Sequence, residues 1–571
     1  MALNDFRHLD PTLSIDADIC IVGSGPAGWT LAEELHDSGL RIVVLESGGV
    51  AESGGCAGRE HEAHALNTTE DVGVPLFNGR CRTLGGTPEI IPWGNRCIAL
   101  DDIDYEARPW VPSSGWPFEA KMIAPYLDRA SRHLGAGPYL PDGPPDTIGK
   151  FKPAVDPDQL HNVCWSFGRQ DDGGTVRYAQ RFRQAPKDHV RVIVNATVTH
   201  LNTNAAGDRI ESVEIAHVDG PRTTVHATAV VLCAGGIENA RILLYSNRQT
   251  PAGIGNAHDL VGRYLMDHPR DHNKTVTFDP KAAGVLHRLF GPYMFDAGAG
   301  RREYVGGLAL SATAQRREQL LNCAAWPALD YFEDDPIAGL QRLKRGDRSR
   351  ATTDLRLAVS HPGLVAKAVQ SWARRQPMRT TYKGVGLFLA SEQTPNPDSR
   401  VTLSDKVDAL GLPIARTDWR IGELDRRSQA ALAMRIRTEF ARLRLPEAQV
   451  AAWVQDGCYD TAVLSDGCHP TGTTRMASDA RTGVVDPDCQ VFGVDGLFIA
   501  GSSVFPTAGH ANPTLMIVAL SCRLADHLKL RISRQAEPGS RDRAPMPRAM
   551  AAPAGTGDPG ERAASLAGSR P

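Results

Sequence analysis

The chain has 571 residues, with 63 basic and 66 acidic side chains and a formal net charge of −3. This length exceeds one ordinary hydrophobic core, so we expect two closely connected domains. The nearly balanced charge, without a sustained basic stripe, argues against nucleic acid as a partner. No apolar run reaches about 18 residues and the first residues do not resemble a signal peptide, so we expect a cytoplasmic protein without membrane insertion.

The eleven cysteines are scattered along the chain and include no Cys-x-x-Cys pair. An odd number in this pattern favours neither a disulfide framework nor a zinc site. We therefore expect no bound metal ion.

The first motif is a glycine-rich turn between two apolar segments. Residues 18–22 are typical of a buried strand, and the motif Gly23-Ser24-Gly25-Pro26-Ala27-Gly28 follows. Residues 29–38 favour a helix, and 41–45 favour a second strand that ends at Glu46 and Ser47. The glycines allow a tight turn and a close approach of the backbone to pyrophosphate, while Glu46 can bind ribose hydroxyls. This predicts a Rossmann-like domain with a central parallel sheet, but the turn alone does not separate NAD from FAD.

A second glycine-rich segment runs from Arg80 to Thr87 and contains Arg82, Gly85 and Gly86. Farther along, residues 136–160 are rich in Gly, Pro and Asp. Such composition favours irregular structure, so we expect a loop or lid insertion over 136–185.

Strand-like segments follow at 190–198, 210–217 and 223–232, and they predict a small β-meander. The last of them ends in the turn Ala234-Gly235. For His268, a structural role is favoured over a catalytic one. Between 276 and 459 we expect a second domain of sheet and helices. Its arginine-rich segment, 340–376, is best interpreted as a solvated helical face, with an oligomer contact or a funnel for anionic substrates as alternatives.

The most informative stretch extends from Asp466 to Ile517. It contains His469 in Gly-Cys-His-Pro-Thr-Gly-Thr, an apolar strand that ends in the turn Gly501-Ser502, and Asn512-Pro513-Thr514 before an apolar helix. A helix N-terminus has unpaired N–H groups, so it suits an anion or the electron-rich end of a reduced cofactor. After it, residues 534–571 have no apolar periodicity and we expect them to be disordered.

These motifs together resemble the glucose-methanol-choline (GMC) flavin oxidoreductases. The resemblance rests on His-Pro-x-Gly-Thr-x-Arg-Met from His469, on Val-Val-Asp at 484–486, on Ala-Gly-Ser-Ser-Val-Phe-Pro-Thr from Ala500, and on Asn-Pro-Thr from Asn512. The Asn-Pro-Thr ending is most similar to bacterial pyranose-oxidase-like sugar and glycoside oxidases. The resemblance implies an α/β fold, with a Rossmann-like FAD-binding domain and an α+β substrate-binding domain.

The resemblance also implies roles for particular residues. His469 would accept the hydroxyl proton of an alcohol while its carbon passes a hydride to the flavin, and Asn512 would orient the alcohol oxygen. His510 would be a neighbour in the substrate pocket. FAD would be non-covalent, because none of residues 80–100 is the histidine through which some members attach it. FAD contacts are implied for the two glycine-rich segments, for Val198, Ala234, Gly235, Gly501 and Ser502, and for Asn512, Pro513 and Thr514.

We expect the FAD-binding domain to comprise 14–135, 186–275 and 460–533, and the substrate-binding domain 276–459. The predicted reaction is oxidation of an alcohol to a carbonyl, on a sugar, polyol or glycoside, with oxygen or a quinone-like carrier as the electron acceptor. Because the base must be a neutral imidazole, alkaline conditions should favour reduction of the flavin. A non-sugar aliphatic or natural-product alcohol, or a hydroxynitrile-lyase-like reaction without net redox change, is the alternative.

Overall fold

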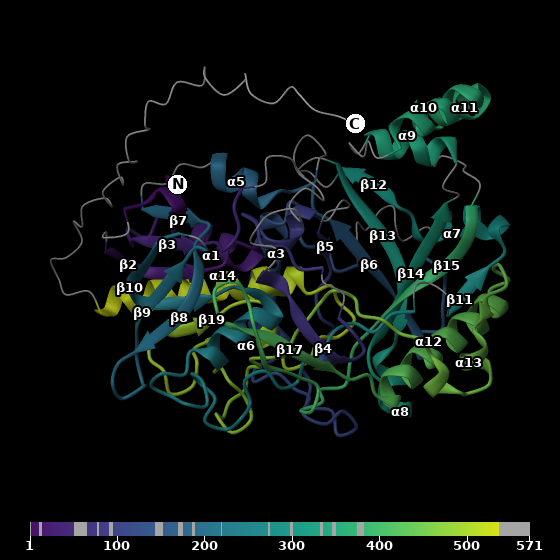
Figure 1. Cartoon of the computed structure of the whole chain (residues 1–571). Coiled ribbons are helices and arrows are strands. Elements are labelled where there is room, and N and C mark those ends of the chain that lie inside the picture. Colours follow the sequence, from purple (N-terminus) through teal and green to yellow (C-terminus); the bar gives the residue numbers. More distant parts are fainter. Residues whose placement is uncertain are drawn as a thin grey trace, which may run out of the picture.

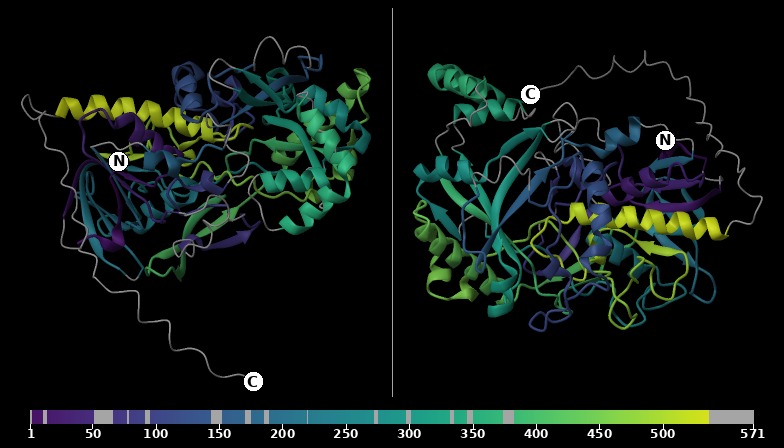
Figure 2. Two further views of the ribbon diagram at one scale, coloured as in Figure 1. Left: turned by 90° about the horizontal axis from the view of Figure 1, so that it is seen from above. Right: turned by 180° about the vertical axis from the view of Figure 1, so that it is seen from behind.

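The structure, a computed structural model, describes residues 2–10, 14–50, 66–76, 79–90, 95–142, 152–169, 175–184, 189–218, 220–271, 275–296, 301–331, 335–344, 350–373 and 382–535. The expected disordered tail lies outside these residues except for its first two, which end a helix. The two largest sheets form two lobes side by side (Figure 2).

The first sheet has a parallel centre and an antiparallel edge (Figure 1). In spatial order its strands are β1 (Ala2–Asp5), β7 (Val190–Val194), β3 (Ile42–Leu45), β2 (Ile15–Val22), β10 (Arg222–Leu232), β9 (Ile210–Ala216) and β8 (Thr197–Thr203), and β19 (Leu497–Ile499) pairs with β10. All four residues of β3 are buried, as expected for a parallel strand covered on both faces. Strands β8, β9 and β10 pair antiparallel, so a meander is present. Its predicted first strand, 190–198, is wrong in part, because residues 190–194 form β7, which pairs parallel with β1 and β3, and β8 begins only at Thr197.

Helices cover this sheet and connect it to the rest of the molecule. Helix α1 (Pro26–Leu35) packs on β2 and β3 and on the long α14 (Thr514–Gln535), which also contacts α3 (Ala124–His133). Helix α6 (Gly235–Tyr245) contacts β8 of the first sheet and a small three-stranded sheet of β16 (Arg400–Val407), β17 (Pro413–Trp419) and β4 (Thr69–Gly73). None of the helices in the described ranges is both long and apolar enough to cross a membrane.

The second sheet is antiparallel and has its own apolar core. In spatial order its strands are β18 (Gln449–Val450), β11 (Val276–Phe278), β15 (Tyr382–Ser391), β14 (Cys323–Tyr331), β13 (Arg301–Leu310), β6 (Leu160–Phe167) and β5 (Arg96–Cys97), and β12 (Tyr293–Asp296) pairs with β13. Helices α7 (Ala283–Phe290) and α12 (Glu423–Arg442) contribute apolar side chains to this core, and α8 (Ala312–Glu318) and α13 (Ala452–Gln455) lie in the same lobe.

The expected loop or lid over 136–185 is wrong in part. Its described residues include β6, which pairs with β13 along its whole length, and α5 (Tyr178–Gln184). All prolines of this segment precede β6, in which Val163, Trp165 and Phe167 bury apolar side chains. Residues 143–151 and 170–174 lie outside the described ranges.

Helices α9 (Pro336–Lys344), α10 (Ala351–Ser360) and α11 (Pro362–Ala373) extend outward at one end of the second sheet (Figure 1). They carry the described part of the arginine-rich segment, whose role stays a prediction. The remaining short elements are α2 (Asp102–Tyr105) and the 3₁₀ turns η1 (Phe6–His8), η4 (Thr87–Ile90), η5 (Ala120–Met122), η6 (Pro280–Ala282), η7 (Tyr459–Thr461) and η8 (Ser502–Val504).

Candidate active site

A cavity of about 830 Å³ connects the glycine-rich turn to the region around His469. Its walls come from the ends of β2 and β3, the start of α6, strands β14 and β15 of the second sheet, and the N-terminus of α14. Segments that lie far apart in the sequence therefore share one site. This volume is in the range that binds a cofactor or a comparable small molecule.

Most of the predicted site residues line this cavity. They are Gly23, Gly25, Pro26, Glu46, Ser47, Arg82, Gly86, Thr87, Val198, Ala234, Gly235, His469, Ser502, Asn512, Pro513 and Thr514. Five predicted residues are not among the lining residues, namely Ala27, Gly28, Gly85, Gly501 and His510. Ala27 and Gly28 instead lie inside the first turn of α1, where they are buried.

The glycine-rich turn has the close packing that a dinucleotide cradle needs. Gly23 has φ +104°, and a Cβ atom there would lie 2.6 Å from the carbonyl oxygen of Cys233. A Cβ atom at Gly28 would lie 1.9 Å from the carbonyl oxygen of Gly23. By contrast, no atom lies within 4 Å of a Cβ atom at Gly25 or Gly235, so both bends leave open space. The close packing at Gly23 and Gly28 excludes any side chain, and the open side of the turn suits the diphosphate of a dinucleotide.

Glu46 lies at the end of β3 and lines the cavity, as predicted. Its carboxylate accepts hydrogen bonds from the Ser24 hydroxyl at 2.6 Å and from the Gly48 backbone N–H at 2.8 Å. Burial raises the pKa of Glu46 above its ordinary value, although these hydrogen bonds oppose the shift. Its contact with a ribose stays a prediction.

His469 forms a hydrogen bond with His268, and a second hydrogen bond of His268 shows which ring nitrogens carry protons. Nε2 of His268 lies 3.1 Å from the carbonyl oxygen of Gly509, and a carbonyl only accepts, so Nε2 carries the proton. Burial lowers the pKa of His268 to about 4, so its ring is neutral and its Nδ1 is an acceptor. The Nδ1 of His469, 2.9 Å away, must then donate.

This leaves Nε2 of His469 without a proton, provided that the ring is neutral. Burial, followed by the charges of His268, Arg96 and Arg270, lowers the pKa of His469 well below its ordinary 6.5. The imidazole of His469 is therefore neutral near pH 7, so its own titration gives no reason for alkaline conditions to favour the reaction. The expected pH dependence stays a prediction. Sequence analysis favoured a structural role for His268, but His268 lines the cavity and contacts the candidate base.

Asp267 organises the turn that carries His469, and sequence analysis missed it. Its Oδ1 accepts the backbone N–H of Gly467 at 2.7 Å and its Oδ2 accepts that of His469 at 2.8 Å. Between them Cys468 has φ +62°. Burial and the nearby charge of Asp466 raise the pKa of Asp267 to about 7, against the effect of the hydrogen bonds. The Asp267 carboxylate thus positions His469 through the backbone of the turn that carries it.

Asn512 and His510 lie in different environments. Asn512 lines the cavity next to the N-terminus of α14, and its Oδ1 is buried without a hydrogen-bond partner among the described residues, so the amide can bind a ligand. His510 is only 1% exposed, and its Nε2 lies 3.4 Å from Asp101 Oδ2. Burial alone would lower the pKa of His510, but Asp101 raises it.

Sequence analysis also missed four lining residues from the second lobe and its borders, which we call the aromatic–arginine wall: Arg96, Arg270, Trp326 and Phe388. The rings of Trp326 and Phe388 stack with centroids 4.4 Å apart. The residues come from separate strands and a loop, and no local motif marks them.

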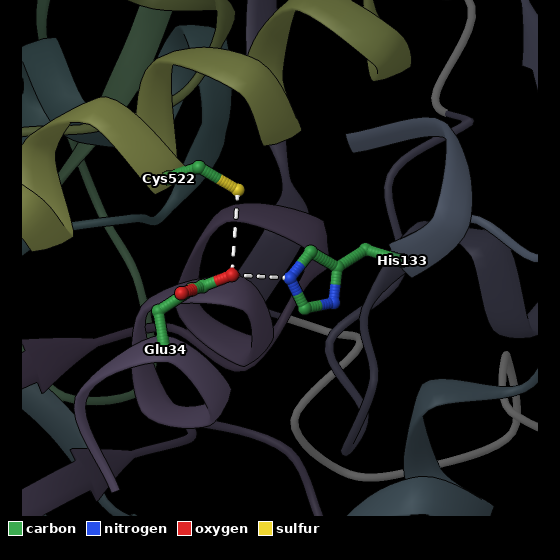
Figure 3. Close-up of side chains that lie close together, drawn as sticks. All are labelled: Glu34, His133 and Cys522. Atoms are coloured by element: carbon green, nitrogen blue, oxygen red, sulfur yellow. Dashed lines mark hydrogen bonds and ion pairs between the residues drawn. The ribbon is translucent and has the colours of Figure 1, made fainter. Parts of the chain in front are cut away.

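A separate cluster of Glu34, His133 and Cys522 joins α1, α3 and α14 away from the cavity lining (Figure 3). Their potential ligand atoms lie within 4.8 Å of one another. The carboxylate of Glu34 already accepts hydrogen bonds from His133 and Arg129, and Arg129 also pairs with Asp526 at 3.0 Å. A guanidinium on the same carboxylate opposes a second cation, so we interpret the cluster as an ion-pair network between helices.

A Rossmann-like domain with a glycine cradle, joined through one cavity to a second sheet and a neutral histidine, defines a dinucleotide-dependent oxidoreductase. A family model described as GMC oxidoreductase matches residues 161–270, a second of that description matches 395–521, and an NAD(P)-binding Rossmann-like domain model matches 21–82.

The chain is also similar to individual proteins of known activity or structure. C-glycoside 3-oxidase from Arthrobacter globiformis is 37% identical over 89% of this chain and 93% of its own length. The fructose dehydrogenase large subunit of Gluconobacter japonicus is 29% identical, but the match spans 60% of this chain and only 54% of that protein. The crystal structure of pyridoxine 4-oxidase from Mesorbium loti has the same fold, with a TM-score of 0.56, 17% identity, and coverage of 89% and 98%. The chain therefore belongs to the GMC oxidoreductase family, and it is an FAD-dependent oxidoreductase that acts on alcohols.

Proposed function

We propose that the protein oxidises a CH–OH group of a sugar, polyol or glycoside to a carbonyl, with His469 as the base and Asn512 orienting the reacting oxygen. The observation that carries this proposal is the hydrogen-bonded pair of His268 and His469, which leaves an unprotonated Nε2 in a cavity continuous with the glycine cradle. A base of this kind takes the hydroxyl proton as the adjacent carbon loses its hydride.

Bound FAD supplies the hydride acceptor. The chain itself holds the cofactor without a covalent bond, through the turn at Gly23–Gly28, Glu46, the segment around Arg82 and Gly86, and the N-terminus of α14. We assign these contacts to an FAD-binding domain built on the first sheet, and the substrate to the second sheet, whose strands β14 and β15 face the cavity.

A carbohydrate substrate is supported by the relatives, since their names include a C-glycoside 3-oxidase and a fructose dehydrogenase. The stacked rings of Trp326 and Phe388 in the cavity wall agree with this, because the apolar faces of sugar rings pack well on aromatic side chains. For the reduced flavin, oxygen or a quinone-like carrier is the proposed electron acceptor.

The test is anaerobic mixing of the FAD-loaded protein with panels of sugars, glycosides, aliphatic alcohols and sterols, while flavin absorbance is followed. We expect rapid bleaching by a carbohydrate and a loss of about 10²- to 10⁴-fold in the reduction rate of His469→Ala, with FAD still bound. His226→Ala, which changes an exposed histidine on β10, is the matched control and should retain the rate. Near-normal reduction of His469→Ala would refute the assignment of the base, and cleavage of a cyanohydrin without bleaching would favour the lyase reaction.

A further inference from the structure

The aromatic–arginine wall places two guanidinium groups beside the candidate base. The guanidinium carbon of Arg96 lies 4.9 Å from the ring centroid of Trp326, and that of Arg270 lies 5.8 Å from the ring centroid of Phe388. Both arginines line the cavity, and both lower the pKa of His469 through their charge. They therefore lie at the catalytic end of the cavity, beside His469.

Neither arginine side chain forms a hydrogen bond or an ion pair with any residue that the structure describes, and the Nε atom of each is buried without a partner. Nearby carboxylates are occupied elsewhere. Asp267 accepts backbone N–H groups, Asp466 accepts the N–H of Cys468 at 3.0 Å, and Glu303 pairs with Arg169. Burial lowers the pKa of Arg96 to about 10, which still leaves it a cation at neutral pH.

Arg96 and Arg270 are partly buried and repel one another, and no carboxylate among the described residues forms a hydrogen bond with either guanidinium, although the charge of Glu303 favours the cation of Arg96. Such an arrangement is costly, because cations that have lost part of their hydration need a partner. The cation–π contacts with Trp326 and Phe388 offset only part of this cost. A guanidinium is a strong donor to planar oxygen anions, with which it forms paired, charge-assisted hydrogen bonds. The missing partner is therefore best supplied by a ligand.

Building on the alcohol oxidation proposed above, we infer that Arg96 and Arg270 form an anion subsite that binds a carboxylate or phenolate group of the substrate. The preferred substrate is then an acidic alcohol, such as a glycoside whose attached group carries the anion. Trp326 and Phe388 provide a flat apolar surface on which a ring bearing that anion can pack. This role differs from an effect of the two arginines on the pKa of His469. An anion subsite strengthens the binding of anionic ligands only, whereas a change in the pKa of His469 would affect the reaction of every substrate.

Binding of benzoate and of its neutral isostere benzamide to the FAD-loaded protein, measured by calorimetry, tests the subsite without turnover. We expect benzoate to bind at least about 10-fold more tightly than benzamide. Arg96→Gln and Arg270→Gln should each weaken benzoate binding by about 10- to 100-fold and benzamide binding by less than about 3-fold. Arg316→Gln, which removes an exposed arginine paired with Glu106, is the matched control and should change neither.

Arg96→Lys and Arg270→Lys keep the charge, so they should retain a preference for benzoate, and bound FAD and melting temperature verify that each variant is folded. Equal binding of benzoate and benzamide, including undetectable binding of both, would overturn the subsite, as would glutamine variants with unchanged benzoate affinity.

A second experiment separates the subsite from the proposed reaction. Anaerobic flavin reduction is compared for 4-carboxyphenyl and 4-carbamoylphenyl β-D-glucopyranoside, which have the same shape and differ only in the carboxylate or the neutral carboxamide group. We expect the acid to need an at least about 10-fold lower concentration for half-maximal reduction, and this advantage to disappear in Arg96→Gln. Equal reduction by both would overturn the subsite and leave the alcohol oxidation standing. If no alcohol reduces the flavin while benzoate binding still depends on the arginines, the subsite stands and the proposed reaction falls.

Discussion

At the scale of single residues, the site is organised by hydrogen bonds that determine where protons lie. Hydrogen bonds run from the Gly509 carbonyl through His268 to His469, and they assign one tautomer to each imidazole. Only Nε2 of His469 is then left as an unprotonated nitrogen towards the cavity. His268 acts through His469 and is a positioning residue. Asp267 has a similar role for the backbone of the same turn.

His268→Leu should slow flavin reduction by about 10- to 100-fold without loss of FAD, because the tautomer of His469 is no longer selected. Asparagine can place an amide oxygen near the position of Nδ1, so His268→Asn should recover part of the rate. Stopped-flow reduction at saturating alcohol measures both variants. Equal rates for the leucine, asparagine and unaltered proteins would refute the positioning role.

Asp267 should make flavin reduction depend on pH near neutrality. Because its pKa is raised to about 7, the ionised form that accepts the N–H groups of the turn is populated above this pH and lost below it. We expect the reduction rate to rise as the pH increases through about 7. In Asp267→Asn, which does not titrate, the overall rate should be lower and this step absent. A step that persists in the variant would assign it to another group.

At the scale of elements, local patterns predicted the glycine-rich turn, α1, strands β9 and β10 of the meander and the helix after Asn512, but they merged β7 with the start of β8. They failed at β6, because glycine and proline at the start of its segment obscured a strand whose partner, β13, lies about 140 residues away in sequence. Helix packing likewise depends on partners that no local pattern specifies. Glu34 on α1 meets His133 on α3 and Cys522 on α14 only in the folded chain (Figure 3).

The Glu34 network should make thermal stability sensitive to acid. Burial alone would raise the pKa of Glu34, but hydrogen bonds from His133 and Arg129 lower it to about 2. Because the folded pKa is below the unfolded one, the stabilisation is complete above about pH 4.5 and is lost as the pH falls towards 2. Glu34→Gln should lower the melting temperature at pH 7 and reduce its fall between pH 5 and 3. Glu211→Gln, an exposed change on β9, should do neither.

At the scale of the whole molecule, the two lobes are joined by a buried polar contact as well as by the cavity. Arg108, which follows α2, forms an ion pair with Glu392 directly after β15, and both side chains are completely buried. One of its hydrogen bonds measures 2.9 Å. The contact lies at the end of β15, the strand that also carries Phe388 of the cavity wall.

Arg108→Met should destabilise the protein by about 3–5 kcal/mol, because it leaves Glu392 charged, buried and unpaired. The double variant Arg108→Met with Glu392→Met removes both charges and should be distinctly less destabilised than Arg108→Met. Denaturant unfolding of the FAD-loaded protein measures both. A double variant at least as unstable as the single one would show that packing, not the unpaired charge, accounts for the loss.

The sequence by itself determined the family and the FAD cofactor, and it predicted His469 as the candidate base, because short contiguous motifs with local backbone requirements carry this information. Gly23 is an example, since its positive φ and its contact with Cys233 exclude a side chain. Only the tertiary structure decided that His268 meets His469, 201 residues away, and that Asp267 holds the same turn. It also decided that Arg96 and Arg270 line the cavity with Nε atoms that have no partner among the described residues. These relations join segments that lie far apart in the sequence, and side-chain proximity between such segments leaves no periodic signal in the chain.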